Sequence, residues 1–136
     1  MVSDKINILL VEDERIIAEY NSLVLQKHGY SVLCAFTGED AVHIALSNNY
    51  ISLILMDINL GKGITGLQAA EIISENKLVP ILFLSNNIQL ETVKGIEAFI
   101  PYGFLSKSSS ESLLIISIIT ALRLFERYKD LVKQIA

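Results

Sequence analysis

Five short apolar runs recur at regular distances along the chain. They are Ile6–Val11, Ser31–Phe36, Leu53–Met56, Ile81–Leu84 and Gly103–Leu105. The first, third and fourth are almost continuously apolar, whereas a strand with one face in water alternates between apolar and polar residues. This pattern predicts strands that are covered on both faces, as in a parallel sheet.

The segments between these runs have the periodicity of helices. One of them carries apolar residues at the spacing of a single helix face: Ile16, Ile17, Tyr20, Leu23 and Val24. Gly29 marks the end of this helix, and Thr37 is placed to cap the next one. Strands that alternate with helices form parallel sheets with helices on both faces, because the crossovers are right-handed. The chain is therefore predicted to be a doubly wound α/β domain with a five-stranded parallel sheet.

The last predicted helix is apolar over most of its circumference. Its main face carries Leu114, Ile115, Ile118, Ile119, Leu122 and Phe125, and further apolar surface comes from Leu113, Ile116 and Leu124. A helix of this kind is buried on more than one side, either within its own domain or against a partner. We expect a partner surface here, with a homodimer as one form of it. Residues 1–125 are assigned to the domain and residues 126–136 to a charged extension of the last helix.

Composition narrows the class of protein. The 136 residues are 51% hydrophobic and 19% charged, which fits one globular domain and excludes a disordered chain. The net charge of −4 argues against direct nucleic-acid binding. The single cysteine, Cys34, excludes an internal disulfide and suits a reducing compartment. Leu113–Leu122 is well short of the roughly 20 apolar residues that cross a bilayer, and no signal peptide is visible, so we expect a cytoplasmic protein without membrane contact.

Polar residues follow the predicted strands, at the edge where open parallel sheets bind ligands. Glu12 and Asp13 follow the first strand, Asp57 follows the third, Ser85 follows the fourth and Lys107 follows the fifth. The carboxyl ends of parallel strands lie at one edge of the sheet. These side chains are therefore expected to converge on a single rim.

The three acids are the chemically informative part of this rim. Carboxylates that lie close together raise each other's pKa unless they share a cation. A site built from oxygen ligands with room for water suits Mg²⁺, and the backbone carbonyl of Asn59 is placed to add a ligand. The alternative is that Glu12–Glu14 is a solvated loop that favours the next helix's N-terminus. The position of Asp57 at the end of a buried strand favours the metal site.

Lys107 and Ser85 extend the chemistry of the rim. Alone, the lysine could form a structural ion pair, and the serine could simply end a strand. Together with a metal-binding acid cluster they match the needs of phosphoryl transfer, where a cation offsets charge on the transferring oxygens and a hydroxyl donates to one of them. Asp57 would then be the nucleophile, with its carboxylate open to an incoming phosphorus.

Four motifs at these strand ends resemble those of the receiver domain of two-component response regulators. The motifs are Val11–Glu14, Leu55–Asp57, Phe83–Ser85 and Phe104–Lys107, and the resemblance covers nearly the whole chain. The resemblance implies a flavodoxin-like sheet with the strand order 2-1-3-4-5. Receiver proteins are known examples of this order among doubly wound folds. The resemblance also implies that the phosphoryl group comes from a sensor histidine kinase or a phosphotransfer protein.

The resemblance assigns a role to each residue of the rim. Asp57 accepts the phosphoryl group, Mg²⁺ is held by Glu12, Asp13, Asp57 and the Asn59 carbonyl, Lys107 and Ser85 bind the phosphoryl group, and Phe104 is the switch aromatic. A plain core role remains an alternative for Phe104. Phosphorylation adds about −1.5 to −2 units of charge, and the switch residues transmit that change to a distant surface.

Two features depart from the family pattern. Ser108 follows Lys107 where the family usually has a proline, often with a cis bond, and we expect a trans peptide bond here. The loop Ile58–Gly66 has a glycine where a proline is common and is one residue longer, as in receivers associated with sensor kinases.

Three functions compete on this sequence. The first is a phosphoacceptor that catalyses only its own phosphorylation and dephosphorylation. The second is a Mg²⁺-dependent aspartyl phosphatase resembling the haloacid dehalogenase family, which requires a second aspartate where this chain has Asn59. The third is a degenerate receiver that acts only as a protein-binding module. The complete set of acids, hydroxyl and lysine favours the phosphoacceptor.

Overall fold

A five-stranded parallel sheet forms the centre of the protein. The computed structural model describes residues 5–86 and 101–135. The strands are β1 (Asn7–Val11), β2 (Ser31–Ala35), β3 (Leu53–Asp57), β4 (Ile81–Ser85) and β5 (Phe104–Ser106). They pair in the order β2-β1-β3-β4-β5, and every pairing is parallel. The predicted sheet and its flavodoxin-like strand order are confirmed.

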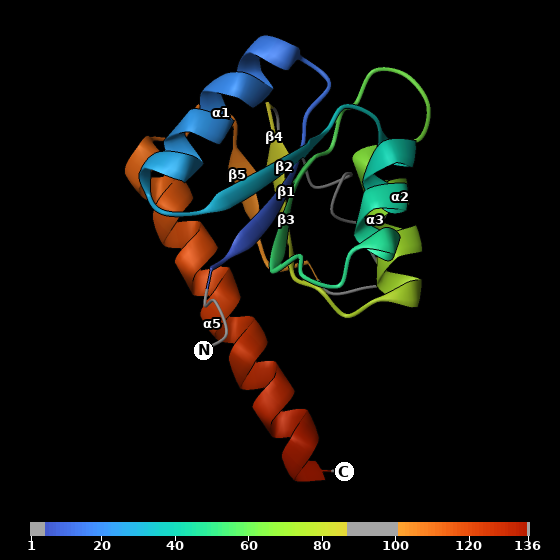
Figure 1. The fold of residues 1–136 in the computed structure, drawn as a ribbon, viewed down its shortest axis with the longest axis vertical. Coiled ribbons are helices and arrows are strands. Elements are labelled where there is room, and N and C mark those ends of the chain that lie inside the picture. The colour runs from blue at the N-terminus through green and yellow to red at the C-terminus, as the bar shows by residue number, and fades with distance from the viewer. Residues whose placement is uncertain (1–4, 87–100, 136) are drawn as a thin grey trace.

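Helices cover both faces of this sheet, as predicted. The helices of the described residues are α1 (Arg15–Lys27), α2 (Gly38–Ser47), α3 (Gly66–Asn76) and α5 (Glu111–Ile135). α2 and α3 lie on one face, and α1 and α5 lie on the other (Figure 1). Thr37 caps α2 by accepting a hydrogen bond from the Asp40 amide, and Thr65 and Gln68 form a capping box at the start of α3. None of these helices is long and apolar enough to cross a membrane.

The alternation of side chains along β1 divides the core into two layers. Leu9 and Val11 pack on the side of α2 and α3, while Ile8 and Leu10 pack on the side of α1 and α5. All residues of β3 and β4 are buried, as the continuous apolar runs predicted. Packing on both faces of the sheet therefore holds the strands in place. The residues at the carboxyl ends of the strands are positioned by the same packing.

The apolar face that the spacing identified on α1 is only partly buried. The buried residues of α1 are Ala18, Val24 and Leu25. Ile16 and Tyr20, which belong to the same apolar set, are 84% and 64% exposed. Ala18 faces the sheet, and Ile16 and Tyr20, each two residues from it, point to the other side of the helix. Apolar spacing identified the helix but not the face that is buried.

α5 is a single helix that runs well past the end of the sheet (Figure 1). Its buried residues are Leu114, Ile115, Ile118, Ala121 and Phe125. Beyond Phe125 the helix continues through the predicted charged extension to Ile135, and there its apolar side chains are exposed. The division between a domain at 1–125 and an extension at 126–136 remains a prediction.

Candidate functional site

The strand order brings the polar residues of the sequence to one edge of the sheet. β1 lies next to β3, with Val11 paired to Met56, so Glu12 and Asp13 emerge beside Asp57. Lys107 comes immediately after β5, and its amide donates a hydrogen bond to the carbonyl of Ser85 at the end of β4. The neighbouring strands β1, β3 and β4 thus contribute adjacent side chains, and the lysine approaches from the edge strand.

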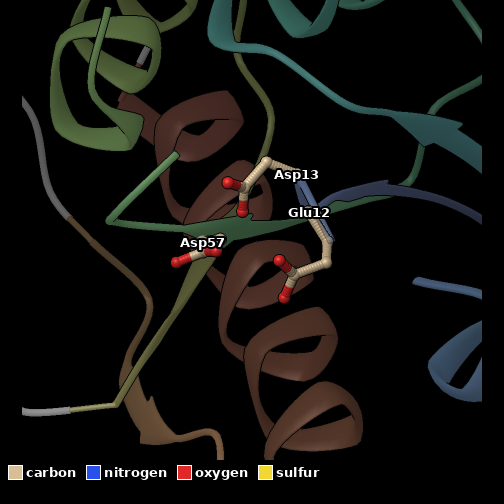
Figure 2. A group of neighbouring side chains, drawn as sticks. All are labelled: Glu12, Asp13 and Asp57. Atoms are coloured by element: carbon tan, nitrogen blue, oxygen red, sulfur yellow. The ribbon is translucent and has the colours of Figure 1, made fainter. Parts of the chain in front are cut away.

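The carboxylates of Glu12, Asp13 and Asp57 form an acid cluster. One carboxylate oxygen from each residue lies within 4.8 Å of the others. Figure 2 shows Glu12 and Asp13 at the end of β1, with their carboxylates beside Asp57 at the end of β3. Glu12 and Asp57 are both 1% exposed, and this burial makes an uncompensated charge costly.

Lys107 bridges the two buried acids. Its Nζ lies 2.7 Å from Asp57 Oδ2 and 2.8 Å from Glu12 Oε1. Burial of the ammonium lowers its pKa, but the short contacts with the two carboxylates outweigh burial, and the pKa of Lys107 is raised above its usual value of 10.5. The lysine therefore stays charged throughout the physiological range.

The ammonium of Lys107 does not supply a hydrogen bond to every buried carboxylate oxygen of this cluster. Glu12 Oε2 accepts a hydrogen bond from the Glu14 amide, but the contact of Oε1 with Lys107 is an ion pair without hydrogen-bond geometry. In the described part of the chain, Glu12 Oε1 is the buried side-chain oxygen or nitrogen that has no hydrogen-bond partner. Buried polar atoms of this kind require an explanation, and a bound ion is one. The donor set, composed of the carboxylate oxygens of Glu12, Asp13 and Asp57, fits a hard divalent cation such as Mg²⁺.

Asp57 is less accessible than the sequence suggested. Its Oδ2 accepts a hydrogen bond from Lys107, and its Oδ1 accepts one from the Asn59 amide at 2.9 Å. Both oxygens are therefore occupied, and the side chain is 1% exposed. The expectation that this carboxylate is open to an incoming group does not describe this arrangement, in which the Lys107 ammonium, itself 12% exposed, occupies Oδ2.

The remaining predicted residues occupy the same region. Ser85 is buried as the last residue of β4. Phe104 is half-buried on β5 and stacks on Phe83, with 5.2 Å between ring centroids. The described backbone contains no cis peptide bond, as expected for Ser108 after Lys107. The hydroxyl of Ser108 lies 2.8 Å from the hydroxyl of Ser106, within hydrogen-bond distance.

An apolar groove borders the acid cluster on the α1 side. Its volume is about 570 Å³, and its lining includes Ile16, Tyr20, Val24, Leu105, Lys107 and Leu114. Apolar side chains of α1 form one wall of this groove. Their spacing was visible in the sequence, but it predicted a helix and not a groove.

The loop between β3 and α3 contains site residues that the sequence analysis missed. A Cβ atom built on Gly61 would lie 2.9 Å from Asp13 Oδ2, so the loop backbone packs directly against the acid cluster. Farther along the loop, the Ile64 amide donates a hydrogen bond to Glu39 in α2. The glycines of this loop were a visible signal, but no sequence pattern linked Glu39 to the site.

Comparison with known proteins gives a consistent result. The family model for the response regulator receiver domain matches residues 8–119. The uncharacterized transcriptional regulatory protein YrkP of Bacillus subtilis is 31% identical over 90% of this chain and 52% of its own length. This chain thus spans about half of that relative, and a third of another, YvrH from the same organism.

Two solved structures are also similar. The N-terminal domain of a response regulator/sensory box/GGDEF three-domain protein from Carboxydothermus hydrogenoformans is 39% identical, with a TM-score of 0.84 over 90% of this chain and 98% of its own. A chain that fuses the yeast Spc42 trimeric coiled coil to another protein is 36% identical, with a TM-score of 0.85 over 99% of this chain and 95% of its own. With the family model covering most of its length, this chain belongs to the family of response regulator receiver domains of two-component systems.

Proposed function

We propose that this receiver domain accepts a phosphoryl group on Asp57 from a sensor histidine kinase or a phosphotransfer protein. The observation that supports this most directly is the acid cluster with Lys107 bridging Glu12 and Asp57 at the carboxyl edge of the sheet. The chain catalyses only the gain and loss of its own phosphoryl group.

The transfer replaces a phosphorus–nitrogen bond with a phosphorus–oxygen bond. A carboxylate oxygen of Asp57 attacks the phosphorus of the donor's phosphohistidine, and the phosphorus–nitrogen bond breaks as the new bond forms. The imidazole nitrogen leaves with the bonding electron pair and takes up a proton from water. The product is a mixed anhydride on Asp57, which water later hydrolyses to release inorganic phosphate.

Lys107 has two partners before transfer and a third after it. In the unphosphorylated protein its ammonium pairs with Asp57 Oδ2, which must be released before the carboxylate attacks. We infer that the ammonium of Lys107 moves from the carboxylate of Asp57 to the negatively charged oxygens of the arriving phosphoryl group. Its raised pKa keeps it cationic for this role.

Glu12, Asp13, Asp57 and the backbone carbonyl of Asn59 are the proposed holders of Mg²⁺. When bound, Mg²⁺ offsets the negative charge that develops on the phosphoryl oxygens. Glu12 Oε1, which forms an ion pair with Lys107 but has no hydrogen-bond partner, supports this assignment because it keeps a lone pair for a divalent cation. Without a divalent cation, Lys107 compensates Glu12 and Asp57, and the carboxylate of Asp13 adds a third negative charge to the cluster.

Ser85 and Phe104 are the proposed switch residues. Ser85 ends β4 beside Asp57, and we propose that its hydroxyl donates to the new phosphoryl group. Phe104 lies in the adjacent strand, where it is half-buried and stacks on Phe83. The change in charge at Asp57 would then reach the surface of β5 and α5.

The apolar groove beside Lys107 supports a helical partner. Ile16 and Tyr20 expose large apolar side chains along it, and Lys107 lies in its lining. An amphipathic helix that binds there would place its phosphohistidine near the acid cluster. Absence of direct nucleic-acid binding and a cytoplasmic location, both expected from the sequence, remain predictions.

Phosphorylation with a small donor tests the proposal. The full 136-residue chain is incubated with Mg²⁺ and acetyl phosphate, and its intact mass is measured. We expect one added phosphoryl group in the wild type and in Asp130→Asn, an exposed aspartate of α5, and none in Asp57→Asn. Absence of the added group from the wild type would support the degenerate receiver. Repeated turnover of a phosphorylated substrate would support the aspartyl phosphatase.

We further propose that α5 mediates self-association. Leu124, Tyr128, Leu131 and Ile135 recur at the alternating spacings of four and three residues that are typical of coiled coils, and all are exposed. The charged residues of this segment lie mostly on the opposite side, including Glu126, Lys129 and Asp130.

Light scattering over a range of protein concentrations tests this second proposal. We expect the mean mass to rise with concentration in the wild type and to remain that of a monomer in Leu131→Glu. Lys133→Glu places a glutamate on the polar side of the helix, with Glu126, Lys129 and Asp130, and should behave as the wild type does. A monomeric mass for the wild type at all concentrations would contradict the proposal.

A further inference from the structure

The β3–α3 loop passes directly over the acid cluster. Gly61 has a φ of +73°, and a Cβ there would lie 2.9 Å from Asp13 Oδ2. A side chain at this position would strain the backbone and would require the Asp13 carboxylate to shift. The loop backbone at Gly61 therefore lies against the Asp13 carboxylate.

Glu39 holds the far end of this loop. Its Oε2 accepts a hydrogen bond of 3.1 Å from the Ile64 amide. Both carboxylate oxygens lie against Gly63, where an added Cβ would be 2.5 and 2.6 Å from them. Gly63 has a φ of +76°, so glycine is favoured there by conformation and by contact. The Glu39 carboxylate therefore fits closely against the backbone of the turn at Gly63.

Apolar packing holds the same end of the loop against α2. A Cβ on Gly38 would lie 2.6 Å from Ile64 Cγ1, so the Ile64 side chain rests on the bare backbone at the start of α2. Ile64 is half-buried against the core layer beneath α2 and α3. The loop is therefore attached to α2 by one hydrogen bond and one close packing contact, neither of which involves the acid cluster.

We propose that Glu39 is a positioning residue for the divalent-cation site. Only two residues separate Gly61 from Ile64, and a chain of that length spans at most about 10 Å. Fixing the Ile64 amide on Glu39 therefore restrains Gly61, and Gly61 restrains the Asp13 carboxylate. The same loop carries Asn59, whose carbonyl is a proposed ligand. This inference rests on the proposed function, because it concerns the affinity of the proposed Mg²⁺ site.

Three variants of the full chain separate positioning from charge. Glu39→Ala removes the acceptor, Glu39→Gln keeps an acceptor oxygen without the charge, and Asp40→Ala removes an equal charge from the same turn of α2. Mg²⁺ affinity is measured by calorimetry, exchange of the Ile64 amide by NMR without metal, and stability by urea unfolding. We expect the Mg²⁺ dissociation constant of Glu39→Ala to rise about three- to tenfold, the range for loss of one hydrogen bond. Its Ile64 amide should also exchange faster.

The two control variants should stay within about twofold of the wild-type Mg²⁺ affinity. An unchanged affinity in Glu39→Ala would overturn the inference, and so would an equal loss in Asp40→Ala, because charge alone would then explain it. A wild type that binds no Mg²⁺ would overturn the proposed function instead. In that case, unmoved amide resonances of Gly61 and Asp13 in metal-free Glu39→Ala would overturn the positioning role as well.

Discussion

Replacing Lys107 with methionine should destabilise the fold much more than the loss of an exposed lysine such as Lys133. The substitution keeps an unbranched side chain of similar length but removes the charge that bridges Asp57 and Glu12. Those two carboxylates are 1% exposed, and their contacts with the ammonium are 2.7 and 2.8 Å long. The variant therefore leaves two buried negative charges next to Asp13 with no cation between them.

The size of the effect follows from burial. Loss of one partner of a buried ion pair costs about 3–5 kcal/mol, because the remaining charge is desolvated and uncompensated. Lys107 is 12% exposed, so some water reaches the site, and we take the lower end of that range. A loss of about 3 kcal/mol is a large part of the 5–15 kcal/mol that is usual for a whole domain.

Urea unfolding followed by circular dichroism measures this loss, since the chain has no tryptophan. The pKa of Lys107 is raised in the folded protein, so its contribution is complete below the usual pKa of 10.5 and is lost as pH rises through the raised value. The difference between wild type and Lys107→Met should therefore be constant between pH 7 and 9 and shrink at higher pH. Added Mg²⁺ should restore part of the variant's stability.

Lys133→Met is the matched control, because Lys133 is an exposed lysine of the projecting helix. Its stability should lie within about 0.5 kcal/mol of the wild type. Equal stability of Lys107→Met and the wild type in metal-free buffer at pH 7.5 would refute the reasoning. It would mean that the acid cluster is solvated in solution and does not depend on the lysine.

Three further predictions concern the surroundings of the site. Gly66→Ala should lower stability by about 3 kcal/mol in the same assay, because a Cβ there would lie 2.0 Å from the Asp57 carbonyl oxygen. Glu111 bonds to His28 and Lys27, which lowers its pKa, so its contribution is present above pH 4.5 and lost as pH falls further. Acid unfolding curves of wild type and Glu111→Gln should accordingly converge below pH 4.5. Tyr20→Ala should slow phosphorylation by a cognate kinase at least tenfold while leaving the rate with acetyl phosphate unchanged, as measured by radiolabel transfer.

The parts of the fold that could be predicted are those that depend on local sequence. Continuous apolar runs identified β3 and β4 because burial on both faces excludes polar residues from the whole strand. The convergence of Glu12 and Asp57 also followed, since adjacent parallel strands place their carboxyl ends together. These inferences need only the strand boundaries and the direction of each strand.

The parts that could not be predicted depend on contacts between distant segments. Apolar spacing on α1 is the same for a core face and for an exposed groove wall, and only the packing of Ala18 against the sheet distinguishes them. Glu39 looks like an ordinary acid in the first turn of a helix, where the helix dipole favours it. Its hydrogen bond joins residues 25 positions apart, and no local pattern encodes that contact.

The burial of Asp57 illustrates the same distinction at the centre of the site. The position of Asp57 in the sequence correctly places its carboxylate at the edge of the sheet. The accessibility of that carboxylate depends on which charged side chains pair with it. Lys107 reaches Asp57 from β5 because two buried acids attract it more strongly than water does. The position of the Lys107 ammonium therefore decides whether the Asp57 carboxylate is accessible. Since that ammonium also compensates Glu12, a divalent cation that takes over this compensation would release Lys107 from the acids. If the proposed cation site is correct, a single side chain couples cation binding to access to Asp57.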